Sequence, residues 1–200
     1  MADTQGRETA VPQVNNAGTL PEILQTVINP ALAALEPHGI PPSDEARAML
    51  CAIGLQESML QFRHQVTQSG IGKGPARGLW QFEAEGGVNG VLRHKKSADM
   101  ARHFATRHAG SRDSRAVWAA LEDNDILACI LARLLLWTDP APLPEASPEA
   151  EAAAWDYYLR LWRPGKARPE KWPRNWEAAV DAVRRRCETA LDADSEGERT

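Results

Sequence analysis

The chain has 200 residues, of which 43% are hydrophobic and 25% are charged, proportions that are typical of globular proteins. A chain of this length fits one domain, with or without tails, and buries a sizeable core without disulfide bridges. Its net charge of −4 gives no general reason to expect nucleic-acid binding.

Positive charge is nevertheless concentrated in two stretches. Residues 60–118 contain ten Lys/Arg and four Asp/Glu, and residues 163–174 contain five Lys/Arg and one Glu. The end of the chain, residues 188–200, carries five acids and one Arg. A basic region beside a cleft would attract an anionic polymer, and solvated surface charge is the alternative interpretation.

Several classes of site are not indicated by the sequence. Cys51, Cys129 and Cys187 lie far apart in apolar helical patterns, and no metal-ligand spacing links them to a histidine. We therefore expect reduced core cysteines, no metal and no cofactor. No apolar run reaches the ~18 residues of a membrane span, and the N-terminus lacks the basic start and apolar run of a secretory signal.

The first predicted elements are an arm and a helix. Residues 1–18 are polar and predict a flexible N-terminal arm. In residues 21–35 apolar side chains recur at spacings of three and four, which predicts a helix capped by Thr19. Pro30 is expected to bend or split this helix, because proline lacks the amide hydrogen of a helical hydrogen bond.

The next helix carries the most informative carboxylate. Ser43, followed by two acids, is a good helix start. The position of Glu57 on a stripe at helical spacing puts it on the buried-looking face at the helix end. Partial desolvation there would raise its pKa toward that of a general acid. The alternatives are an exposed glutamate or one paired with Arg63 or Arg77. The other members of the stripe are Ala46, Leu50, Ile53 and Gly54.

The middle of the chain predicts a loop and then three helices. Residues 69–78 include four glycines and one proline and predict a loop or, over residues 70–82, a small β-hairpin. Helices are expected over residues 97–108, 114–121 and 126–137. The last is apolar on nearly every side, which is typical of a helix at the centre of a bundle.

Two further helices are expected in the C-terminal part, over residues 147–162 and 175–191. The acidic residues 192–200 predict a disordered tail. The sequence contains no convincing run of alternating strand residues. It therefore predicts an all-α fold, with a single helical domain over residues 19–191 between the arm and the tail.

Two short motifs carry a resemblance to a known family. Gln56-Glu57-Ser58, followed by Gly78-Leu79-Trp80-Gln81, resembles the lytic transglycosylase and goose-type lysozyme superfamily, in particular its phage or prophage-encoded members. A third motif matches loosely, because Tyr157 or Tyr158 precedes Arg163-Pro164-Gly165 but the family's usual Asn is missing. The resemblance covers about residues 20–180.

The resemblance implies a lysozyme-like helical fold and cleavage of peptidoglycan glycan strands at the β-1,4 bond between N-acetylmuramic acid and N-acetylglucosamine. Glu57 would protonate the glycosidic oxygen and then act as a base. Ser58 would orient the carboxylate or an acetamido group, and the Gln81 amide would hydrogen-bond an acetamido group. Trp80 and Tyr158 would offer flat faces to sugar rings. The substrate-binding residues expected in this way are Ser58, Gly78, Leu79, Trp80, Gln81, Tyr157 and Tyr158.

The same resemblance leaves the attacking group open. A hydrolase of this kind needs a second carboxylate, for which Glu83, Glu85 and Asp99 are candidates by residue type alone. With one acid, the muramic 6-hydroxyl would attack and leave an anhydro end. Core packing is the alternative role for every aromatic residue of the site, and it is the favoured one for Trp155 and Trp162.

Two other functions compete with the enzyme. The first is a phage virion structural protein, a tail, adaptor or head-completion component with a lysozyme-like fold and weak or no activity, whose arm and tail would dock to other virion proteins. The second is a helical DNA-binding module, for which no helix-turn-helix pattern is present, so nucleic acid is not an expected partner. An enzyme made in the bacterial cytoplasm without a signal would reach the wall inside a virion or during lysis.

Overall fold

The computed structural model describes residues 18–67 and 70–197 and is mostly helical, which confirms the predicted fold class. The predicted N-terminal arm lies outside the described residues, apart from Gly18. The helices are α1 (Leu20–Ile23), α2 (Asn29–Leu35), α3 (Asp44–Ser58), α4 (Asn89–Arg93), α5 (Ala98–Ala109), α6 (Ser114–Ala120), α7 (Asp125–Thr138), α8 (Glu151–Trp162) and α9 (Trp172–Gly197).

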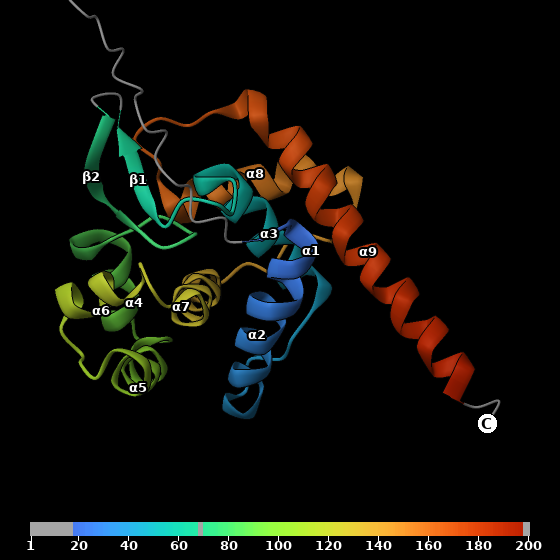
Figure 1. Cartoon of the computed structure of the whole chain (residues 1–200), viewed down its shortest axis with the longest axis horizontal. Coiled ribbons are helices and arrows are strands. Elements are labelled where there is room, and N and C mark those ends of the chain that lie inside the picture. Colours follow the sequence, from blue (N-terminus) through green and yellow to red (C-terminus); the bar gives the residue numbers. More distant parts are fainter. Residues whose placement is uncertain (1–17, 68–69, 198–200) are drawn as a thin grey trace, which may run out of the picture.

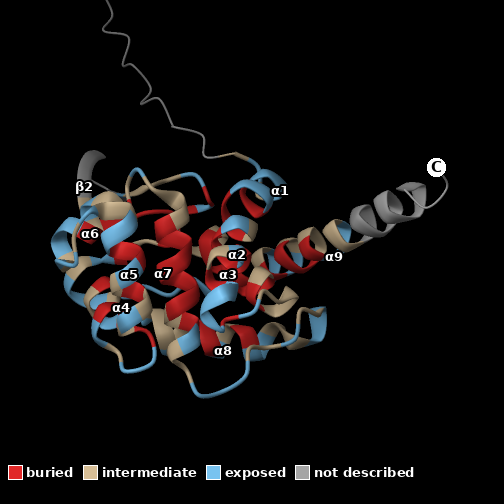
Figure 2. Cartoon of the chain, turned by 90° about the horizontal axis from the view of Figure 1, so that it is seen from below, coloured by how far each residue is buried: buried red, intermediate tan, exposed pale blue. Residues whose placement is uncertain are grey.

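Helix α7 lies at the centre of the molecule, as its apolar sequence predicted (Figure 2). Helices α2, α3, α4 and α5 all contact it, and its side chains join a single core with those of α3 and α9. Asn124 caps α7 by accepting a hydrogen bond from the amide of Leu127 at 2.9 Å. Arg133 is the charged side chain that this helix carries into the core.

The predicted N-terminal helix is continuous rather than split at Pro30. Thr19 and Glu22 form a capping box at its start. A π-helical turn, η1 (Leu24–Ile28), joins α1 to α2. Pro30 cannot donate to the carbonyl four residues before it, and that carbonyl lies in this turn. The helix accommodates the missing hydrogen bond by widening into the π-helical turn, so it does not break.

The glycine-rich segment forms an antiparallel sheet of three strands in the order β1-β2-β3. Strand β1 (His64–Thr67) pairs with β2 (Gly70–Arg77), which pairs with β3 (Phe82–Glu83). The hairpin predicted over residues 70–82 is therefore present but begins earlier. Figure 1 shows it at one side of the helical body, opposite the far end of α9.

Helix α9 is longer than predicted at both ends. It begins at Trp172 instead of residue 175 and continues to Gly197, into the segment that was expected to be a disordered tail. Residues 198–200 lie outside the described part of the chain. The helix packs along α3 (Figure 1), and Trp172 and Trp176 lie fully buried on its inner side. The C-terminal helix is thus part of the frame around α3.

Candidate active site

The site is built on the end of α3. The chain leaves this helix through two successive residues in the left-handed region, Met59 (φ 57°) and Leu60 (φ 54°). Leu60 donates its amide to the carbonyl of Gly54 at 3.1 Å and buries its side chain. A Cβ on Gly54 would collide with the Leu60 side chain, so glycine permits this return of the chain. Glu57 is therefore held in the last helical turn.

The Gly-Leu-Trp-Gln segment is attached to α3 by two hydrogen bonds. The Ser58 hydroxyl donates to the Leu79 carbonyl at 2.6 Å, and Nε1 of Trp80 donates to the Leu50 carbonyl at 2.9 Å. Gly78 has a φ of 73°, and a Cβ there would lie 3.0 Å from the Leu121 carbonyl oxygen. The two motifs found in the sequence thus pack directly against each other.

Within the described residues the Glu57 carboxyl has one hydrogen-bond partner, the hydroxyl of Tyr158, which donates to Oε1 at 2.7 Å. Burial raises the pKa of Glu57 from its usual 4.5 to about 7, against the lowering effects of the Tyr158 hydrogen bond and the Arg168 charge. A carboxyl with this pKa is partly protonated at neutral pH and so meets the requirement for a general acid.

Neither arginine that the sequence offered as a partner contacts Glu57. Arg63 makes a two-point contact with Asp125 at 2.9 and 2.6 Å. Nε of Arg77 lies 2.9 Å from a carboxylate oxygen of Glu122. Glu57 is half-buried and pairs with neither arginine, so both alternatives, an exposed glutamate and one paired with Arg63 or Arg77, are wrong.

Tyr158 is fixed by aromatic packing. Its ring stacks on that of Trp172, with centroids 5.2 Å apart and an interplanar angle of 15°. Burial and the neighbouring Glu57 carboxyl raise the pKa of Tyr158 far above its usual value, so the hydroxyl remains a neutral donor. The predicted role of Tyr158 is corrected: its ring face belongs to the core, and its hydroxyl serves Glu57.

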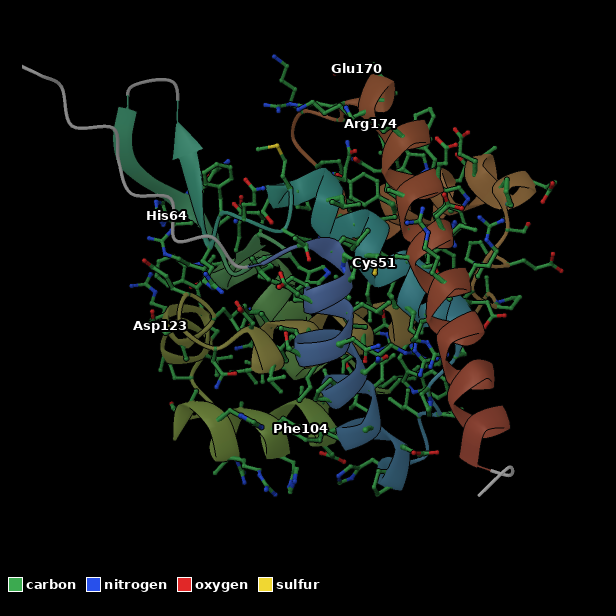
Figure 3. All side chains as sticks on the ribbon, turned by 45° about the vertical axis from the view of Figure 1, so that its right-hand side comes forward. Cys51, His64, Phe104, Asp123, Glu170 and Arg174 are labelled. Carbon is green, nitrogen blue, oxygen red and sulfur yellow. The ribbon has the colours of Figure 1, made fainter. Side chains whose placement is uncertain are left out.

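A cleft of about 1130 Å³ opens beside Glu57. Its wall combines the end of α3, the β3 region, the end of α8 and the segment that joins α8 to α9. Figure 3 shows His64, which lines the cleft, at the left of the molecule and Glu170, in the segment before α9, near its top. Among its lining residues are Glu57, Ser58, Gln81, Phe82, Glu83, Tyr158, Trp162, Arg163, Lys166, Arg168 and Lys171.

Other predicted substrate contacts are buried away from this cleft. Trp80 is fully buried and bonded to α3, so its face cannot stack on a sugar. Leu79 and Gly78 are buried as well. The hydroxyl of Tyr157 donates to the carbonyls of Leu136 and Ala141 at 3.1 and 3.3 Å. These four residues frame the site, and the core-packing interpretation holds for both aromatic side chains.

Two polar residues of the first two motifs have more restricted roles than expected. Ser58 is buried, and its hydroxyl is used by the carbonyls of Leu79 and Gly54. The Gln81 carboxamide nitrogen donates to the carbonyls of Phe62 and Gly78 at 3.1 and 2.9 Å. Because both of its amide hydrogens are used, a bond from Gln81 to a ligand would have to employ Oε1.

Only one of the three candidate second carboxylates, Glu83, is among the described residues that line the cleft. Glu85 lies 3.5 Å from Arg115 on an exposed surface. Asp99 is fully exposed on α5. Any two-carboxylate mechanism in this cleft would therefore use Glu83.

Trp162, Gln56 and Arg168 belong to the site although the sequence did not assign them to it. Trp162, expected in the core, lines the cleft and donates from Nε1 to the Trp80 carbonyl at 3.0 Å. Gln56 donates to the Arg168 carbonyl at 3.0 Å and accepts from Asn175 at 2.8 Å. Two sequence features could have pointed to these residues: Gln56 is adjacent to Glu57, and residues 163–174 carry an excess of positive charge.

Within the described part of the chain, no group of three or more His, Cys, Asp or Glu residues is placed to hold a metal ion. Cys51 and Cys129 are buried and free, as predicted, whereas Cys187 is half-buried and lies 3.5 Å from Asp44. None of the described helices combines the length and the apolar character needed to cross a membrane.

Comparison of the chain with family models, with curated proteins and with solved structures finds no match. The inference of function therefore depends on the geometry around Glu57 and on the two sequence motifs that meet there.

Proposed function

We propose that this protein is a peptidoglycan-cleaving muramidase of the lytic transglycosylase or lysozyme type, associated with a phage. Its substrate would be the β-1,4 bond between N-acetylmuramic acid and N-acetylglucosamine. The observation that carries the proposal is the half-buried Glu57 carboxyl, whose pKa is about 7, at the wall of a large cleft. The resemblance of its two motifs to the lytic transglycosylase superfamily supplies the bond and the substrate.

In the proposed reaction Glu57 donates its proton to the glycosidic oxygen as the bond to the leaving sugar breaks. Where Glu57 is the sole catalytic carboxylate, it then removes the proton of the hydroxyl that attacks the anomeric carbon. Tyr158 supports both steps, because its hydroxyl bonds to Oε1 at 2.7 Å and stabilises the charge that appears on the carboxylate. A neutral donor is suited to this role, since a lysine or arginine there would keep Glu57 ionised.

The attacking group divides the proposal into two variants. If Glu83 activates water, the products have reducing ends. If Glu57 is the sole catalytic carboxylate, the muramic 6-hydroxyl attacks and the products have anhydro ends. Mass analysis of the released muropeptides distinguishes these ends. The substitution Glu83→Gln would abolish cleavage only if water is the attacking group.

The proposal is tested with purified cell walls and the Glu57→Gln variant, which keeps the shape of the side chain and removes its proton. We expect the wild type to release soluble fragments and the variant to be slower by about 10² or more. Glu85→Gln, an exposed glutamate beside Arg115, is the matched control and should cleave like the wild type. Equal release by Glu57→Gln and the wild type would refute the proposed mechanism.

A second candidate is a phage virion structural protein with little or no activity. It is favoured by the observation that Ser58, Leu79 and Trp80 all have complete structural roles. A purely structural role gives no reason for a desolvated carboxyl in a cleft, because such a carboxyl lowers stability when it is ionised. Absence of any fragment release by the wild type, together with incorporation of the protein into virions, would favour this candidate.

A further inference from the structure

One side of the cleft is formed by four cationic side chains. Arg163, Lys166, Arg168 and Lys171, here called the cationic rim, all line the cleft and are all exposed. Among the described residues, none of the four is in an ion pair. A fifth cation of the lining, Arg160, differs because it is bonded to Asp139 at 2.6 Å.

The backbone of the rim is anchored at several points. The amide of Arg163 donates to the Leu159 carbonyl at 3.1 Å and ends α8 in the left-handed region, with a φ of 46°. Further along, the Arg168 carbonyl accepts from Gln56 on α3 at 3.0 Å and from the Lys171 amide at 3.1 Å. The backbone that carries the positive charges is therefore anchored beside Glu57 and is not a free loop.

The positive charge of the rim exceeds the negative charge around it, although one acid, Glu170, lies on the same segment. Glu57 and Glu83 are the acids among the described lining residues of the cleft. The Arg168 charge already acts on the Glu57 carboxyl. Four cations grouped along one wall produce a local positive potential, which an anionic ligand would neutralise with a gain in both affinity and association rate.

We infer that the cationic rim is a subsite for carboxylates that the substrate carries beside its glycan chain. This inference rests on the proposed function and adds a basis for specificity. Peptidoglycan bears free carboxylates on the peptide stems that branch from its sugar chain, whereas a neutral polymer of N-acetylglucosamine has none. The rim should therefore favour the anionic polymer, with the half-buried face of Trp162 left for the sugars.

Nucleic acid is the other polyanion that a row of cations suggests. It is disfavoured because the protein has a net charge of −4 and its unpaired cleft cations lie along one segment. A glycan with carboxylates on its side branches needs positive charge along only one side of the cleft. The cationic rim provides such an arrangement.

The test measures binding rather than cleavage. Binding of Glu57→Gln to insoluble peptidoglycan, freed of phosphate-containing polymers, is compared with binding to the same material after amidation of its carboxylates. A second variant carries Lys166→Glu and Lys171→Glu in addition to Glu57→Gln. The matched control instead adds Lys95→Glu and Arg107→Glu, two exposed residues outside the cleft lining, so that the net charge changes equally.

We expect the rim substitutions to weaken binding about tenfold at low salt and the control pair to change it less than twofold. Amidation should weaken binding of the parent to a similar degree, and raising the salt to about 0.5 M should remove the difference. Equal binding of native and amidated peptidoglycan, or equal binding by the rim and control variants, would overturn the inference. Duplex DNA bound as tightly as peptidoglycan would overturn it too.

The outcome is separate from that of the cleavage experiment. If the wild type releases no fragments but binding depends on the carboxylates and the rim, the subsite stands and the proposed catalysis fails. If the wild type cleaves native and amidated walls at the same rate, and the rim substitutions change neither binding nor rate, the catalysis stands and the subsite fails.

Discussion

The hydroxyl of Tyr158 donates a hydrogen bond of 2.7 Å to Oε1 of Glu57, across 101 residues of sequence. This bond connects the end of α3 to the middle of α8, and the stacking of Tyr158 on Trp172 connects both to α9. The state of one carboxyl thus depends on three helices. Four predictions concern this arrangement and the frame that holds it.

Replacing Tyr158 by Phe should raise the pKa of Glu57 further, because the lost hydrogen bond favours the ionised carboxylate. The alkaline limb of the pH profile for wall cleavage should move to higher pH by about one pH unit. The maximal rate should fall about tenfold, since the carboxyl is no longer held in one orientation. A pH series of fragment release measures both effects.

Tyr157→Phe is the matched control for this substitution. Its hydroxyl bonds to the Leu136 and Ala141 carbonyls and does not contact Glu57. It should lower the free energy of unfolding by about 1 kcal/mol and leave the pH profile in place. An unchanged alkaline limb in Tyr158→Phe, or the same movement in both variants, would contradict the assigned role of Tyr158.

The stability of the protein should depend on pH through Glu57. Its pKa is about 7 in the folded protein and 4.5 ordinarily, so the folded state binds more protons between these values. The protonated Glu57 therefore adds to the free energy of unfolding. This contribution is complete below about pH 4.5 and is lost as the pH rises through 7, and the loss amounts to roughly 3 kcal/mol. Urea denaturation from about pH 4.5 to about pH 8 should show this loss in the wild type and not in Glu57→Gln.

The exposed-glutamate variant Glu85→Gln provides the reference for that experiment, because it removes a carboxyl from the surface beside Arg115. It should follow the wild-type pH dependence. Parallel curves for the wild type and Glu57→Gln would mean that Glu57 is solvated in the folded protein.

Gly54→Ala should destabilise the protein although alanine is the better helix former. The added Cβ would meet the buried Leu60 side chain and lie 3.5 Å from Nε1 of Trp80. We expect a loss of about 1–3 kcal/mol in the free energy of unfolding. Gly90→Ala in α4 is the control, since a Cβ there meets nothing within 4 Å, and it should stabilise by about 0.5–1 kcal/mol. Stabilisation by Gly54→Ala would show that the turn after α3 is looser than described.

Trp80→Phe should affect stability and not ligand binding. The substitution leaves the Leu50 carbonyl without its 2.9 Å partner and opens a void in the core, at an expected cost of about 2 kcal/mol. Trp137→Phe, at a tryptophan that is 37% exposed, should stay within about 0.5 kcal/mol of the wild type. A stable Trp80→Phe protein that no longer binds peptidoglycan would restore the sugar-stacking role that the sequence suggested.

Local sequence features predicted much of the fold because they act over a few residues. The start of α3 at Ser43, whose hydroxyl accepts from the Ala46 amide at 3.2 Å, follows from the capping preference of serine. The central position of α7 follows from a side-chain pattern that leaves no polar face. The early start of α9 could not be predicted in this way, because its first turn is stabilised by burial of Trp172 against other helices.

By itself, the sequence determined a mostly helical chain and placed Glu57, within the first of two motifs, at a helix end, because periodicity and capping are properties of neighbouring residues. Only the tertiary structure decided that Tyr158 serves Glu57 while the adjacent Tyr157 and the motif residue Trp80 belong to the frame. Neighbours on a helix point in different directions, and the side that faces a cleft depends on how distant helices pack.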